Sequence, residues 1–208
     1  MTDSTAGRPD TETPVESSPW NVPNALTVFR IVLVPVFAWV LLSHPHDVGW
    51  RIAAAVIFAV AIATDGVDGY LARKHDIVTT FGKLADPIAD KALTGMAFIG
   101  LSVIGELWWW VTIAILVREW GITAMRFIVL RYGVMAAGRG GKVKTVLQAV
   151  AVIFYLLPLP SWAHPFAVAV MAVAFVLTIG TGIDYIREAV SMRRGSDRGR
   201  PADKGQGV

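Results

Sequence analysis

Four aspartates stand at short, regular spacings in one stretch of the chain, and together they indicate a divalent-metal site. They are Asp65, Asp68, Asp86 and Asp90. On a helix of 3.6 residues per turn, the first two share a face, and so do the last two. Carboxylate oxygens suit hard ions such as Mg2+ and Mn2+, which also take substrate phosphates as ligands. Two such ions, roughly 3.5–4 Å apart, would clamp a pyrophosphate and stabilise the attacking and leaving oxygens of a transfer reaction.

The alternative is that these aspartates only cap helices and pair with neighbouring basic residues. Asp86 followed by Pro87 indeed has the pattern of a helix start. The candidate partners are Arg73, Lys74, Lys83 and Lys91. One aspartate would be explained in this way, but four carboxylates at the edge of a membrane are costly unless they are paired or bound to metal.

The rest of the chain predicts the helices that position this cluster. Of the 208 residues, 54% are apolar and 17% are charged, against about a quarter charged in soluble domains. A helix crosses the bilayer core with roughly 20 apolar residues, which predicts an all-α, polytopic membrane protein with six transmembrane helices. The predicted segments are 26–42, 52–71, 88–104, 108–130, 146–159 and 166–186. Pro35 is expected to kink the first, and Pro158 and Pro160 to end the fifth.

Basic residues follow every second predicted helix, and this asymmetry predicts the orientation of the chain. They are Arg73, Lys74, Lys83, Arg131, Arg139, Lys142 and Lys144, with Arg193, Arg194, Arg198, Arg200 and Lys204 in the C-terminal tail. Both termini are therefore expected in the cytoplasm, as a disordered tail over 1–19 and a basic disordered tail over 191–208. Arg51 is the exception on the other side. The net charge of +3 is modest, and we expect membrane lipids rather than nucleic acid as partners.

The aspartate run also resembles a known family. It fits the CDP-alcohol phosphatidyltransferase signature D-x2-D-G-x2-A-R-x8-G-x3-D-x3-D from Asp65 to Asp90 at every fixed position. The segment 20–30, with its Asn24, Thr27 and Arg30, is similar to the N-terminal part of that family. Residues 118–119, Arg126 and the run 141–145 are similar to its bacterial phosphatidylglycerophosphate synthases. The resemblance covers roughly residues 20–155.

This resemblance implies a six-helix domain over 20–190 in the plasma membrane, commonly a homodimer, with a polar cavity that opens on the cytoplasmic side. The four aspartates would hold two divalent ions, and Asp90 would also be the base that deprotonates the acceptor alcohol. Gly69, Arg73 and Thr79 would contact the CDP part of CDP-diacylglycerol. The acceptor hydroxyl would attack the phosphorus that carries diacylglycerol, and CMP would leave.

The basic residues near the predicted fourth and fifth helices favour a phosphorylated acceptor, glycerol 3-phosphate. Its phosphate would need cations of its own, because the metals already serve the donor. The candidates are Arg118, Arg126, Arg139, Lys142 and Lys144. Three alternatives remain: ion pairs with Glu119 or Asp184, another acceptor (phosphatidylglycerol, as in cardiolipin synthesis, or an inositol phosphate), and an ion or proton transporter. A transporter would place its charges near the midplane, often in related halves, and the sequence has no internal repeat.

The predicted orientation can be tested with reporter fusions. Fusions after Lys83, Arg139 and Ser191 should all report a cytoplasmic location, because the basic segments stay on that side. A fusion within the connection before Trp108 should report the opposite side. One reporter on the wrong side after any of the three basic segments would refute the predicted topology.

Overall fold

The computed structural model describes residues 22–75, 80–129 and 140–198, with side chains over 25–66, 88–125 and 143–187. Over these ranges the chain forms six α-helices and no strand, which confirms the predicted all-helical class. The helices are α1 (Val22–Ser43), α2 (Val48–His75), α3 (Thr80–Val103), α4 (Trp109–Val129), α5 (Gly140–Leu156) and α6 (His164–Arg198).

Local sequence accounts for several helix ends. The Asp47 carboxylate accepts a hydrogen bond of 3.0 Å from the Trp50 amide and so caps the start of α2. Gly105 has a φ of 81°, and the Glu106 amide donates back to the Leu101 carbonyl at 2.9 Å, which closes the end of α3. Pro35 is accommodated inside α1, which runs through it.

Two helices begin six or more residues before their predicted starts. Helix α3 begins at Thr80, so Asp86 and Pro87 lie inside it rather than at its start. A proline removes one backbone hydrogen bond but is tolerated in membrane helices, whose neighbours satisfy the freed carbonyl. Helix α5 begins at Gly140, six residues before the predicted segment, because its first turn is polar and basic and gives no hydropathy signal.

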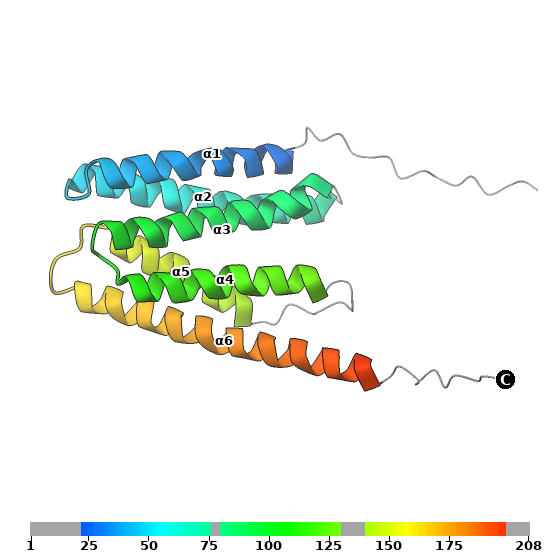
Figure 1. Cartoon of the computed structure of the whole chain (residues 1–208). Coiled ribbons are helices and arrows are strands. Elements are labelled where there is room, and N and C mark those ends of the chain that lie inside the picture. The colour runs from blue at the N-terminus through cyan, green and yellow to red at the C-terminus, as the bar shows by residue number, and fades with distance from the viewer. Residues whose placement is uncertain (1–21, 76–79, 130–139, 199–208) are drawn as a thin grey trace, which may run out of the picture.

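The six helices lie side by side and alternate in direction (Figure 1). Helix α1 packs on α2 and α3, while α6 packs on α4 and α5, and the contacts of α3 with α4 and of α2 with α5 join these two groups. Among the described residues, the backbones of α4 and α5 do not pack closely although the helices are consecutive, and their side chains meet through the ion pair of Glu119 with Lys144. The second halves of α2, α4 and α6 therefore lie at the same end of the bundle as the first halves of α1, α3 and α5. We call this the polar-site end.

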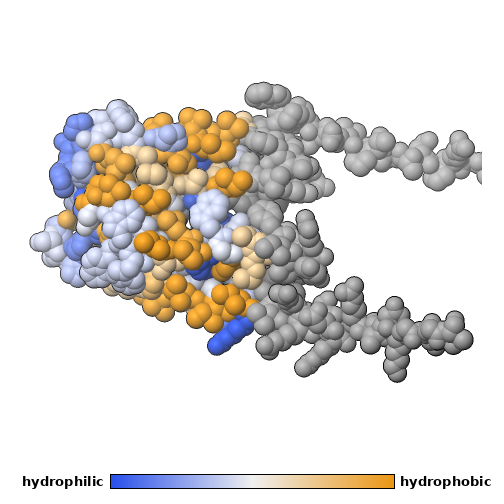
Figure 2. Space-filling model, in the orientation of Figure 1, coloured by the Kyte–Doolittle hydropathy of each residue, from blue (hydrophilic) through white to orange (hydrophobic). Residues whose placement is uncertain are grey.

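The outer surface of the bundle is suited to lipid. Three segments, Ala25–Ser43, Val48–Gly66 and His164–Arg187, are long and apolar enough to cross a bilayer. Their large apolar side chains face outward, and Val32, Val56 and Val176 are each more than half exposed. Figure 2 shows apolar residues across the middle of the visible face and more polar ones where α1 gives way to α2. The chain is thus a helical membrane protein, and its number of spans remains a prediction, supported by three segments.

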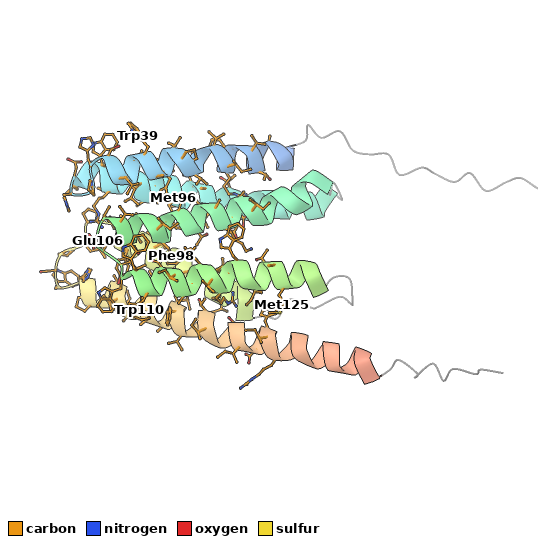
Figure 3. All side chains as sticks on the ribbon, viewed as in Figure 1. Trp39, Met96, Phe98, Glu106, Trp110 and Met125 are labelled. Carbon is orange, nitrogen blue, oxygen red and sulfur yellow. The ribbon has the colours of Figure 1, made fainter. Side chains whose placement is uncertain are left out.

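The opposite end of the bundle is tied together by Arg51. Its guanidinium pairs with Glu106, from the α3–α4 connection, and donates to the carbonyls of Tyr155 and Leu156 at the end of α5. These carbonyls have no partner within their own helix, so Arg51 serves as their cap. Glu106 and Trp110 lie at this end and Met125 lies toward the polar-site end (Figure 3). The exceptional position of Arg51 in the charge pattern therefore has a structural reason.

Candidate active site

Helices α2 and α3 bring two of the four aspartates together. Asp65 lies in the second half of α2 and Asp90 in the first half of α3, so both belong to the polar-site end. The two carboxylates interact electrostatically, as Asp90 also does with Arg30, Lys91 and Glu119. Asp65 keeps 45% of its side chain exposed, which leaves it accessible to a ligand.

The other two aspartates occupy helical positions next to these. Asp68 follows Asp65 by three residues on α2, and Asp86 precedes Asp90 by four on α3. Continuous helices through both pairs agree with the spacing argument that each pair shares a face. The side chains of Asp68 and Asp86 are not among the described ones. The convergence of all four aspartates on one point therefore stays a prediction.

The remaining predicted site residues fall partly or wholly outside what the structure describes. Four lie on described helices, with side chains that are not described: Gly69 and Arg73 on α2, Arg126 on α4 and Lys142 on α5. Thr79 and Arg139 lie in 76–79 and 130–139, which are outside the described residues. Arg118 and Lys144 are described in full.

Arg30 lies against the aspartate motif, although the sequence predicted no role for it. It lies on α1, its side chain is completely buried, and its Nη1 is 2.6 Å from Oδ1 of Asp65. The available signal was a single arginine within an apolar helix, since an intramembrane charge marks a functional site by default. Arg30 also belongs to the segment 20–30, whose resemblance to the family was taken as a whole, so its charge was not interpreted separately.

A small pocket lies beside Asp90, between α3, α4 and α5. Its volume is about 30 Å3, enough for a water molecule. Asp90, Lys91 and Glu119 give it a charged side, and the rest is lined by neutral polar side chains such as Gln148 and by apolar ones such as Phe98. The pocket therefore joins the proposed base to the polar cluster on the next helices.

Glu119 is the centre of that cluster. Its carboxylate accepts a hydrogen bond of 2.9 Å from Nη1 of Arg118 and pairs with the buried Lys144 of α5. Nη2 of Arg118 donates at 2.7 Å to the Thr181 hydroxyl of α6. The ion pairs with Glu119 that the sequence left open are therefore formed. One carboxylate nevertheless faces two cations, so the cluster carries one positive charge in excess.

The donor set fits a divalent metal. Asp65 and Asp90 offer only carboxylate oxygens, which are hard-ion ligands, and two like charges that interact favour a bound cation. Within the described side chains, which do not include Asp68 and Asp86, no group of three potential ligands is present. The four aspartates are thus the residues that could hold the ions.

Comparisons with known proteins agree with the sequence motif. The CDP-alcohol phosphatidyltransferase family model matches residues 20–180. A Mycobacterium tuberculosis (strain H37Rv) protein named "Probable phosphatidylglycerophosphate synthase" is 50% identical over 171 residues, 82% of each chain. The CDP-diacylglycerol–glycerol-3-phosphate 3-phosphatidyltransferase of Bacillus subtilis is 38% identical over 181 residues, 80% of this chain and 93% of the relative. That of Escherichia coli K12 is 37% identical over 179 residues, 82% and 95% of the two chains.

The Glu119 cluster makes a prediction about stability. Glu119→Ala leaves two partly buried cations without their carboxylate and should destabilise the protein by about 3 kcal/mol or more. Removing one cation as well, in Glu119→Ala/Lys144→Met, should recover part of this loss, because the two sites are coupled. Thermal unfolding in detergent measures both. If the double variant lost as much as the two single variants combined, the cluster would not be coupled as the geometry indicates.

Proposed function

Since the chain belongs to the CDP-alcohol phosphatidyltransferase family, we propose that it transfers the phosphatidyl group of CDP-diacylglycerol to sn-glycerol 3-phosphate. The products are phosphatidylglycerophosphate and CMP. One observation carries this proposal: relatives named for this reaction in Bacillus subtilis and Escherichia coli are 37–38% identical over nearly their whole length. The aspartate motif supplies the chemistry, and the Glu119 cluster supplies the reason for a phosphorylated acceptor.

In the proposed reaction, the acceptor hydroxyl gives its proton to the Asp90 carboxylate and its oxygen attacks the phosphorus that carries diacylglycerol. A new oxygen–phosphorus bond forms, the bond from that phosphorus to the bridging oxygen breaks, and CMP leaves with the electron pair. Asp65, Asp68, Asp86 and Asp90 would hold two divalent ions, Mg2+ or Mn2+, which neutralise charge on the pyrophosphate. Gly69, Arg73 and Thr79 are proposed to contact the CDP part of the donor.

The acceptor is proposed to lie near the charged side of the pocket beside Asp90. Asp90 of α3 and Glu119 of α4 both line this pocket, and Glu119 pairs with Arg118 and Lys144. The excess positive charge of this cluster suits an acceptor phosphate, and guanidinium and ammonium groups are its natural donors. Three further basic residues complete the proposed phosphate site: Arg126, Arg139 and Lys142.

The proposal includes a location. Arg30, Asp65, Asp90 and Lys144 lie at the polar-site end and Arg118 lies at the middle of α4. The basic connections that predict the cytoplasmic side follow the helix ends at the polar-site end. We therefore propose six spans in the plasma membrane, with the active site and both termini in the cytoplasm. The homodimer implied by the family resemblance is part of the same proposal, and blue native electrophoresis or crosslinking in membranes tests it.

The aspartates can be tested one at a time. Asp65→Asn, Asp68→Asn, Asp86→Asn and Asp90→Asn keep the side-chain volume but remove the charge that a divalent ion needs. Each should lower CMP release from CDP-diacylglycerol by at least about a hundredfold, the scale of a lost electrostatic stabiliser. Asp90→Asn should still bind the donor, because its further role is that of a base. Asp47→Asn is the matched control, since asparagine caps a helix equally well.

A single result would remove Asp90 from this role. If the Asp90→Asn protein turned over at a near-normal rate with Mg2+ present, another group would have to accept the proton. Normal activity in all four variants would refute the metal site as a whole.

The acceptor can be tested through steady-state kinetics. Arg118→Ala and Lys142→Ala should raise the apparent KM for glycerol 3-phosphate by about tenfold or more, with a much smaller change for CDP-diacylglycerol, because ground-state binding of the phosphate is lost. Arg187→Ala, an exposed position on α6, is the control and should change neither. An unchanged acceptor KM in both variants, or faster turnover with phosphatidylglycerol, would instead favour a cardiolipin-type reaction.

A further inference from the structure

Arg30 is unusual among the charged residues of the bundle because its side chain is completely buried. It lies on α1, a helix that is otherwise apolar from Val22 to Ser43 apart from a few small polar residues. A buried guanidinium is costly unless a carboxylate compensates it. The compensating group is Asp65 on α2, with 2.6 Å between Nη1 and Oδ1, and Arg30 also interacts electrostatically with Asp90 on α3.

A purely structural role for such a pair has an example in the same chain. Arg51 pairs with Glu106 at the opposite end, where it also caps the last carbonyls of α5. Neither Arg51 nor Glu106 belongs to the aspartate motif. The Arg30 pair differs in both partner and surroundings, because Asp65 is the first residue of that motif and remains nearly half exposed.

This geometry leaves Asp65 able to take a second ligand. Its Oδ1 is paired with a cation that burial immobilises, yet nearly half of the Asp65 side chain remains exposed. Groups that hydrogen-bond a ligating carboxylate fix its orientation, and their loss typically weakens metal binding by about 10–100-fold. Arginine suits this task because its planar fork loses little freedom when it binds a carboxylate.

We propose that Arg30 is a positioning residue of the metal site, which orients Asp65 for a divalent ion. The proposal rests on the metal site of the proposed function and adds to it a residue from α1, outside the aspartate motif. It makes α1 part of the site rather than only a membrane anchor.

The test compares Arg30→Lys with Arg51→Lys in the purified full-length protein. Lysine keeps the charge, so electrostatic competition with the metal is preserved and only the guanidinium geometry is lost. Binding of Mn2+ alone is measured by electron paramagnetic resonance, and thermal unfolding in EDTA checks that both variants are folded. Arg30→Lys should raise the Kd for Mn2+ about tenfold, while Arg51→Lys, a matched change at the other end, should leave it unchanged.

A second measurement shows whether Arg30 acts through Asp65. In an Asp65→Asn background, adding Arg30→Lys should change the Kd for Mn2+ by less than about twofold, because the group to be positioned is already altered. A further tenfold change there would overturn the assigned partner, and an unchanged Kd in the single Arg30→Lys variant would overturn the proposal itself.

These outcomes also separate this inference from the proposed function. If the natural protein binds Mn2+ and Arg30→Lys binds it equally well, only the positioning role fails. If the natural protein releases CMP but binds no Mn2+, the metal site fails and the role of Arg30 fails with it.

Discussion

Charge buried in a membrane bundle must be compensated within the bundle, and this constraint organises the structure. Among the described side chains, Arg30, Arg51 and Arg118 are buried or nearly so, and each pairs with a carboxylate from another segment or from the next residue. An uncompensated charge in hydrocarbon would cost several kcal/mol. The helices are therefore held in register by the positions of their ionic groups as well as by apolar packing.

The two ends of the bundle meet this constraint differently. At one end, Arg51 pairs with Glu106 and caps the last carbonyls of α5, so the charges there stabilise the fold. At the polar-site end the balance is incomplete. Arg30 compensates Asp65, which also interacts with the like charge of Asp90, and Glu119 has two cations against its single charge. An anionic pole and a cationic pole thus stand side by side, as a reaction between a metal-bound pyrophosphate and a phosphorylated alcohol requires.

Sequence alone predicted most of the helices because apolar runs of membrane length are strong signals. It placed the starts of α3 and α5 too late, since their first turns are polar and carry no such signal. The metal motif followed from the spacing of Asp65, Asp68, Asp86 and Asp90. The arrangement around Glu119 could not be predicted, because its partner Lys144 is 25 residues away and Thr181 is 63 residues from Arg118. Pairings across helices depend on rotation and depth of packing, which periodicity does not specify.

The position of α6 has a consequence for how the protein is made. Helices α4 and α5 both pack on α6, and Thr181 on α6 completes the contacts of Arg118. A ribosome delivers α6 last. Helices α2 and α3, which carry the aspartates, can insert early. Arg118 acquires its partner on α6 only after Thr181 has entered the bilayer. Assembly of the site is thus coupled to the insertion of α6.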